Sequence, residues 1–215
     1  MKSINKFKNL VKERNFADWG IIGSIIILFA LFIPQIGYKG RQGENYSILN
    51  HFVSELGELG VSHLALVFNI GLFIGGLFYL LFMVGFGKFI ENKIAKVAMV
   101  IGIISSICSS LVGVFPMNYL VPHYIAAMGF FFGALITILV FTIAILVQKN
   151  GKIPKLFSIP GFLVAVVYVW MLSYMFSGNT SDLTVNFTSR PDIWIVPILE
   201  CSAILSVVGY LLLIS

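Results

Sequence analysis

Six apolar runs of about 20 residues constrain the fold of this chain more than any other feature. A helix needs roughly 20 consecutive apolar residues to cross the hydrocarbon core of a bilayer. The runs are continuously apolar rather than alternating, which argues against a β-barrel, and a helix satisfies its backbone hydrogen bonds within the span. The sequence therefore predicts an all-α, polytopic membrane protein with a six-transmembrane-helix bundle. The expected spans are residues 19–37, 64–87, 95–115, 123–147, 156–176 and 193–214.

The composition leaves no room for a soluble domain. Of the 215 residues, 59% are hydrophobic and 11% are charged, whereas a soluble domain carries about 25% charged residues. We therefore expect a single transmembrane domain over 19–215, preceded by a cytoplasmic basic segment over 1–18. Residues 1–37 are not expected to be a signal peptide, because the apolar run is too long and no cleavage site follows it. Apolar and basic residues mix in 4–16, which suits a helix lying on the inner leaflet; a frayed tail is the alternative.

The basic residues are distributed unevenly between the two sides of the predicted bundle. Eleven of the 14 lysines and arginines lie in the N-terminal segment or in the loops after spans two and four, against three on the other side, Lys39, Arg41 and Arg190. The positive-inside rule then places both termini in the cytoplasm of a protein in the cell membrane. Loops 38–63, 116–122 and 177–192 are expected outside. The net charge of +5 is explained by topology, so no nucleic-acid partner is expected.

Three glycosylation sequons and two cysteines fit this topology. The sequons at Asn45, Asn179 and Asn186 all fall in predicted outside loops, although short sequons arise by chance and do not establish glycosylation. Cys108 and Cys201 lie at similar depth in spans three and six. Cysteine is commonly a small buried hydrophobic residue, so we expect free thiols. A disulfide between the two is possible only if spans three and six are in contact.

Small residues recur in spans two and three. Such spacing allows close helix packing in membranes, and we interpret these positions as structural. The first three spans show no visible match to the last three, which weakens an inverted-repeat transporter hypothesis. The residues are Gly71, Gly75 and Gly76 in span two and Gly102, Ser106, Ser110 and Gly113 in span three.

Glu200 is the acidic residue placed within a predicted span. An unpaired acid there costs around 2.5 kcal/mol or more, so it should face the bundle interior. Arg190 or a histidine is the expected partner. The residue indicates either a binding or proton-handling carboxylate or a structural ion pair that orients span six.

The first outside loop contains a second polar group. In residues 49–59, His51, Glu55 and Glu58 are spaced i, i+4 and i+7 beside an apolar stripe, which predicts a short amphipathic surface helix. The alternative is a solvated helix at the edge of the bundle that has no role in binding or catalysis. A His-x-x-x-Glu pair can also ligate a divalent metal, with His63 and His123 completing the site. The motif is weak, and no other cofactor is expected because metalloprotease, nucleophile-elbow and P-loop motifs are missing.

Two stretches of this sequence resemble a known family. SELGELGVSHLALVFNIGLFIGG (54–76) and GVFPMNYLVPHYIAA (113–127) are similar to the signature of the uncharacterised membrane family catalogued as domain of unknown function 998. Arg190 and Glu200 match its final span less closely. The same outline resembles the eukaryotic Frag/DRAM/Sfk group, whose members are six-spanning and tied to lipid handling. The matching residues are Ser54, Glu55, Gly57, Phe68, Asn69 and Gly75, then Phe115, Pro116 and His123.

Three functions remain open from the sequence, and whether the protein is an enzyme is undecided. The first is a protein that binds or modifies a membrane lipid headgroup, with Arg190 holding a phosphate or carboxylate and Glu55 with His123 acting as acid and base. The second is a small-ion or proton-coupled transporter that uses Glu200; the third is a non-catalytic assembly subunit. The candidate catalytic residues are Glu55, His123 and Glu200, and the candidate ligand-binding residues are Arg190, Ser54 and Asn69.

Overall fold

The six apolar runs form six helices in the computed structural model, which describes residues 15–177 and 190–215. Each helix is long and apolar enough to cross a membrane, and no β-strand occurs within these two ranges. The predicted six-helix membrane bundle is therefore confirmed. The helices are α2 (Phe16–Ile36), α3 (Ala65–Ile90), α4 (Lys93–Val114), α5 (Leu120–Val147), α6 (Ser158–Phe176) and α7 (Ile195–Ile214), with short 3₁₀ helices η1 (Val53–Gly57) and η2 (Lys155–Phe157).

The helix boundaries lie within a few residues of the predicted spans. The largest differences are at α2, which starts inside the predicted N-terminal segment, at α3, which extends past Gly87 to Ile90, and at α5, which starts at Leu120 rather than at residue 123. Phe16 explains the first, because its ring packs against those of Phe82, Phe86 and Phe89 and makes this turn part of the core. The remainder of the predicted surface helix over 4–16, and the sequons at 179 and 186, lie outside the described residues.

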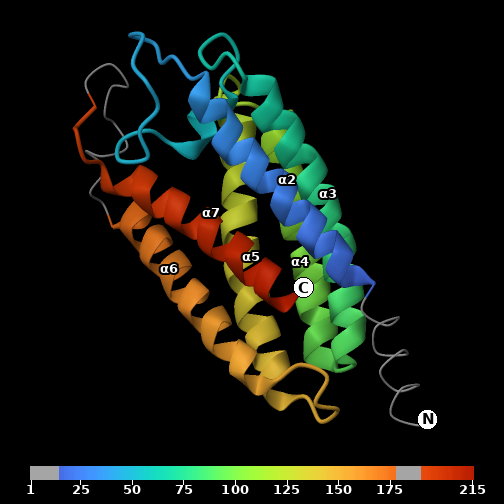
Figure 1. Cartoon of the computed structure of the whole chain (residues 1–215). Helices are drawn as coiled ribbons and strands as arrows, with labels where there is room; N and C mark the ends of the chain where they lie inside the picture. The colour runs from blue at the N-terminus through green and yellow to red at the C-terminus, as the bar shows by residue number, and fades with distance from the viewer. Residues whose placement is uncertain (1–14, 178–189) are drawn as a thin grey trace.

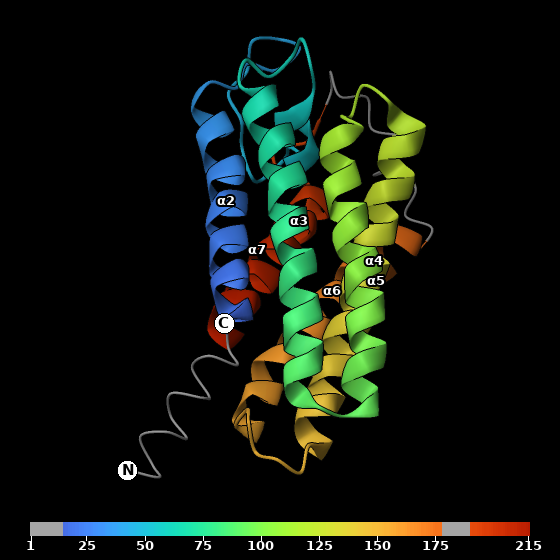
Figure 2. The same ribbon diagram turned by 90° about the vertical axis from the view of Figure 1, so that its right-hand side faces the viewer.

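The six helices form a closed ring. Each helix packs mainly against its neighbours in the chain, and α7 closes the ring by contacting α2. In Figure 1, α7 crosses in front of the bundle at a marked tilt and its end approaches α2. Figure 2 shows α2, α3 and α4 side by side with α7 passing behind them. This order leaves an interior that is shared by α3, α4, α5 and α7.

Small residues bring α3 and α4 together, as their spacing predicts. A side chain at Gly76 would collide with the hydroxyl of Ser110 and would lie 2.8 Å from its backbone nitrogen. Gly113 faces the backbone of Asn69 and Phe73 just as closely. The Ser110 hydroxyl donates a hydrogen bond to the Phe73 carbonyl at 3.0 Å. The small residues of these two spans are therefore packing positions.

A long connection covers one end of the bundle, and we call residues 37–64 the roof (blue to teal at the top of Figure 1). The predicted amphipathic helix over 49–59 was wrong: the roof contains only the short helix η1. Helical structure cannot extend back from Val53 because Phe52 is extended, with φ −62° and ψ 145°. The lysine-bearing connection between α5 and α6 lies at the opposite end of the bundle in Figure 1. Which end faces the cytoplasm stays a prediction.

Candidate functional site

A bidentate ion pair fastens the roof to the segment that leads into α7. The two nitrogens of the Arg190 guanidinium each donate to one oxygen of Glu55, both at 3.0 Å. The Tyr38 hydroxyl donates to Oε2 of Glu55 at 3.1 Å, and the Phe52 amide donates to Oε1 at 2.8 Å. Both oxygens of Glu55 therefore have two donors, and we call these four residues the clasp.

Further charged and aromatic groups surround the clasp. Glu44 lies 3.6 Å from Arg190 and 3.7 Å from the His51 ring. Burial raises the pKa of Glu44, but hydrogen bonds from backbone amides and the charge of Arg190 outweigh it and bring the pKa below its ordinary value. Burial lowers the pKa of His51, a change that the nearby carboxylates oppose only in part. His51 is therefore a neutral ring packed edge-on against Tyr38 at 5.4 Å.

Two members of the clasp, Glu55 and Arg190, are the predicted catalytic and ligand-binding residues, and the structure pairs them with each other. Arg190 was expected to pair with Glu200 or to hold a lipid phosphate, but it is engaged by Glu55 and also donates to the Asn50 carbonyl at 3.1 Å. Glu55 is 2% exposed, and its lone pairs are occupied. The pair is thus a structural link, and its chemistry is not available to a ligand without breaking four hydrogen bonds.

Beneath the roof, an internal cavity contains the two other predicted catalytic residues. His123 from α5, Glu200 from α7 and Ser54 from η1 all line it, together with Ser109 of α4 and Tyr79 of α3. The remaining walls are apolar, and the free space suffices for a few water molecules rather than for a lipid chain. The structure therefore brings together Ser54, His123 and Glu200, and places Glu55 and Arg190 above them.

Glu200 is held by the backbone of the roof. Its Oε2 accepts a hydrogen bond from the Val53 amide at 2.8 Å. No arginine, lysine or histidine forms an ion pair with it among the side chains that the structure describes. The expected ion pair was wrong because Arg190 has a nearer carboxylate in Glu55. Glu200 consequently faces the cavity with an oxygen that the roof does not occupy.

His123 is oriented by the turn that precedes α5. Its Nδ1 lies 2.8 Å from the carbonyl oxygen of Phe115. A carbonyl oxygen only accepts, so Nδ1 carries the hydrogen and Nε2 of the neutral ring has a free lone pair. His123 is 7% exposed, and its ring lines the cavity. The imidazole is therefore fixed in one tautomer with an acceptor available.

The predicted ligand residues Ser54 and Asn69 have different surroundings. Ser54 lines the cavity, and its hydroxyl makes a weak contact of 3.7 Å with the sulfur of Met117. Asn69 donates to the carbonyl of Gly57 at 2.9 Å and so ties η1 to α3. Asn69 is thus a support for the roof, whereas Ser54 remains available to a bound molecule.

The residues proposed for a metal site do not gather. His63 contacts the Gly37 carbonyl at 3.1 Å, and His123 the Phe115 carbonyl, while His51 lies beside Glu44 in the roof. In the described part of the chain, no three or more histidine, cysteine or acidic side chains are grouped to hold a metal ion. Cys108 and Cys201 are free thiols. A divalent metal stays a prediction without a cluster to support it.

A crevice between α2 and α7 opens beside the cavity. Its walls are apolar side chains of both helices, and residues Tyr46 to Leu49 of the roof form its upper edge. Leu31 and Val53 line both the crevice and the cavity. The crevice holds several times more free space than the cavity. A single layer of side chains therefore separates the outside of the bundle from the space that Glu200 faces.

The comparisons with known proteins identify the family of this chain. The profile of a family described as "Protein of unknown function (DUF998)" matches residues 22–190, which is most of the chain. The protein belongs to this family. The match includes the roof, the start of α5 and Arg190, and ends before Glu200. No curated protein and no solved structure matches the chain, and the similarity to the Frag/DRAM/Sfk group stays a prediction.

Several residues of the site were missed by sequence reasoning. Tyr38 and the Val53 amide bind the two key carboxylates, but a tyrosine after a span and a backbone amide carry no distinctive sequence signal. Ser109 lines the cavity although its serine-rich helix predicted only packing. Glu58 does not line the cavity and pairs with the partly exposed Arg41 at 2.6 Å.

Proposed function

We propose that this protein binds a membrane lipid, with the hydrocarbon portion in the α2–α7 crevice and the headgroup in the cavity of Ser54, His123 and Glu200. The observation that carries the proposal is that Leu31 and Val53 line both spaces, so that a movement of these two side chains would join the crevice to the internal polar site. Ligand sites of this kind are mostly apolar with a few convergent polar groups.

The surroundings of the crevice suit acyl chains. Phe32 of α2 and Ile48 and Leu49 of the roof are 52%, 44% and 47% exposed. Exposed apolar side chains at the height of a membrane helix face hydrocarbon at no cost. Gln35, Tyr46 and Ser47 supply polar groups at the upper edge. A lipid lying here would keep its chains against α2 and α7 and its polar part beneath the roof.

The cavity is of headgroup size. Its small free volume excludes a second hydrocarbon chain but admits a short polar group in place of a few waters. His123 and Glu200 are the groups available there for acid–base chemistry, since the Glu55 carboxylate is occupied by the clasp. Any modification of the lipid would therefore depend on these two residues.

Native mass spectrometry of the protein extracted in mild detergent tests lipid binding. Leu205 lines the crevice, so Leu205→Trp should fill it and reduce retained lipid several-fold. The matched control is Leu213→Trp on the same helix, where the side chain is 51% exposed to the outside; this variant should retain lipid like the parent. Equal lipid retention by Leu205→Trp, Leu213→Trp and the parent would contradict the proposal.

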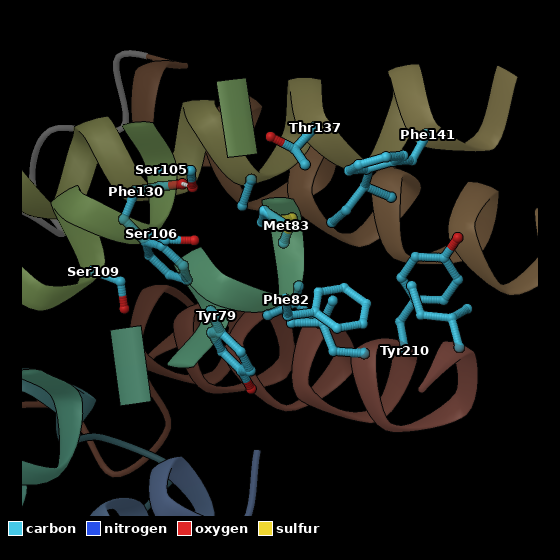
Figure 3. Close-up of a pocket in the computed structure, with 15 residues that line it drawn as sticks. Tyr79, Phe82, Met83, Ser105, Ser106, Ser109, Phe130, Thr137, Phe141 and Tyr210 are labelled. Atoms are coloured by element: carbon cyan, nitrogen blue, oxygen red, sulfur yellow. Dashed lines mark hydrogen bonds between the residues drawn. The ribbon is translucent and has the colours of Figure 1, made fainter. Parts of the chain in front are cut away.

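A second candidate function is transport of protons or small cations, and one observation favours it. A second narrow cavity continues from the first toward the far end of the bundle and shares Tyr79, Ser109, Phe130 and Val207 with it. Figure 3 shows Ser105, Ser106, Ser109, Thr137 and Tyr210 among the residues that line this space. Acidic residues within a membrane mark ion pathways in other proteins, and Glu200 lines the first of the two cavities. Flux into proteoliposomes that disappears in Glu200→Gln would support this function, and no flux in the parent would exclude it.

A further inference from the structure

We propose that the cavity selects a lipid headgroup rich in hydrogen-bond donors, above all a primary ammonium group such as that of an ethanolamine lipid. This inference rests on the proposed lipid-binding function and names its ligand class. It is carried by three features of the cavity: the acceptors it presents, the unpaired carboxyl group of Glu200 and its size.

The polar atoms presented to the cavity are chiefly acceptors. Nδ1 of His123 donates a hydrogen bond to the Phe115 carbonyl oxygen at 2.8 Å. Nε2 of the neutral ring therefore keeps a lone pair that can accept a hydrogen bond. Glu200 offers a carboxylate oxygen beyond the one that accepts from Val53 at 2.8 Å. The hydroxyl of Ser54 can accept as well as donate. A ligand that fits this set must supply hydrogens on nitrogen or oxygen.

A cationic ligand would supply the charged partner that the Glu200 carboxyl group lacks among the described residues of this cavity. The Val53 amide stabilises the ionised form of Glu200, and no basic side chain pairs with Glu200 in the residues that the structure describes. An isolated charge within a membrane is costly, so a cationic ligand would recover that cost. Phe68, Phe130 and Phe131 contribute to the wall, and aromatic faces attract cations.

The arginines near the cavity are paired with other carboxylates and do not neutralise Glu200. Arg190 is bound to Glu55 through two hydrogen bonds of 3.0 Å, and Arg41 is paired with Glu58 at 2.6 Å. An anionic headgroup placed in the cavity would therefore meet the carboxylate of Glu200 without a free cation. The site that the sequence predicts for phosphate or carboxylate is better matched to the opposite charge.

The size of the cavity separates two cationic headgroups. A primary ammonium carries three N–H donors on one nitrogen, whereas a trimethylammonium carries none and is larger by three methyl groups. With free space for only a few waters, the cavity accommodates the smaller group and can hydrogen-bond with it through Glu200 and His123. We therefore expect ethanolamine lipids to bind in preference to choline lipids and to anionic glycerol lipids.

Competition between lipids in vesicles tests this preference. The protein is reconstituted in phosphatidylcholine vesicles containing equal minor shares of phosphatidylethanolamine and phosphatidylglycerol, and retained lipids are counted by native mass spectrometry. The parent should enrich phosphatidylethanolamine about tenfold, equivalent to about 1.4 kcal/mol. Glu200→Gln preserves the shape but removes the charge, and should lose most of this enrichment while still retaining lipid in the crevice.

Matched variants keep the result interpretable. Glu91→Gln makes the same change at an acid that pairs with Lys152 at the other end of the bundle and should behave like the parent. His123→Phe should lower the enrichment by removing the Nε2 acceptor. Melting temperatures of all variants show whether each is folded, and a Glu200→Gln protein that fails to fold is replaced in the comparison by Glu200→Asp, whose shorter side chain should weaken the preference.

The possible outcomes separate this inference from the proposed function. Equal enrichment in the parent and in Glu200→Gln, or a preference for phosphatidylcholine or phosphatidylglycerol, would overturn the headgroup inference and leave lipid binding intact. No retained lipid in any vesicle would overturn both. If free ethanolamine at millimolar concentration displaces all bound lipid or accumulates inside the vesicles, the ligand is a soluble amine, and the lipid assignment fails.

Discussion

Glu55 and Arg190 lie 135 positions apart in the chain and meet through two parallel hydrogen bonds of 3.0 Å. Their side chains are only 3% and 9% exposed, and the Tyr38 hydroxyl reinforces the pair from the end of α2. The pair therefore connects the approach to α7 with the roof, which contributes Val53 and Ser54 to the cavity wall. The roof in turn supplies the Val53 amide that holds Glu200.

Removing either half of this pair should destabilise the protein strongly. A buried charge left without its partner costs about 3 kcal/mol, so Glu55→Ala and Arg190→Ala should each lower the melting temperature markedly. The double variant should lose less than the sum of the two, because it leaves no unpaired charge. Thermal unfolding in detergent measures all three.

The Arg41–Glu58 pair is the control for these Glu55 and Arg190 variants. Arg41 is 43% exposed, and solvent screening limits such pairs to about 1 kcal/mol or less. Arg41→Ala should therefore have a small effect. Equal and additive losses at the two pairs would show that the bidentate geometry of the clasp has no special importance.

His51 should make stability depend on pH. Burial keeps its folded pKa below the value near 6.5 of an unfolded chain, so the unfolded state binds more protons as the solution becomes acidic. The stabilisation by the neutral ring is complete above about pH 6.5 and is lost as pH falls through the lowered folded pKa. His51→Gln should flatten this part of the stability profile.

The exposed His63 serves as the control for that measurement. Its ring lies outside the clasp and contacts the Gly37 carbonyl, and His63→Gln should keep the pH dependence of the parent. The measurement is unfolding by heat at a series of pH values. A parent whose stability is unchanged between about pH 7 and pH 5 would rule out this role for His51.

Gly57 should resist substitution because of its approach to α3. A Cβ atom there would collide with the side-chain oxygen of Asn69 and would lie 2.6 Å from the ring of Phe68. Forcing extra volume into such a contact costs about 1–3 kcal/mol. Gly57→Ala should lower the melting temperature accordingly, and part of the loss should return in the double variant with Asn69→Ala, since the clash is then partly relieved. Simple additivity of the two changes would contradict this explanation.

The α3–α4 contact predicts a similar sensitivity within the membrane. Gly76→Ala should push Ser110 away and separate the two helices, because the added carbon has no free space. Gly209→Ala on α7 makes the same change where nothing lies within 4 Å, and should be neutral or slightly stabilising because alanine favours helix over glycine by up to about 1 kcal/mol. Melting curves in the same detergent would distinguish the two positions, and equal effects would argue against close packing at Gly76.

The six spans were predictable because each is set by its own residues. A run such as 123–147 is apolar throughout, and its membrane environment leaves helix as the available structure. The packing role of Gly76 and Gly113 was also predictable, since small residues at regular spacing indicate close helices. The surface helix over 49–59 was not, because its i, i+4, i+7 pattern came from side chains that are fixed by distant partners rather than by a helical period.

The site could be predicted only as a set of residues, without their pairing. Glu55, His123, Arg190 and Glu200 were all singled out, yet the sequence could not show that Arg190 meets Glu55 and leaves Glu200 to a backbone amide. Such choices depend on which side chains the ring of helices brings to the same height. The tautomer of His123 likewise depends on a hydrogen bond to the Phe115 carbonyl. Because every residue has a backbone carbonyl, the sequence does not indicate which one His123 contacts.

The closing of the ring by α7 against α2 also sets an order for biosynthesis. Helices α3, α4, α5 and α6 can each pack on the preceding helix as soon as they leave the translocation machinery, whereas Arg190 and Glu200 arrive with the segment made after them. Until α7 reaches α2, the carboxylate of Glu55 lacks its arginine and the interior is open to bulk lipid along one side. The space that Glu200 faces is thus enclosed on this side only when α7 has packed against α2.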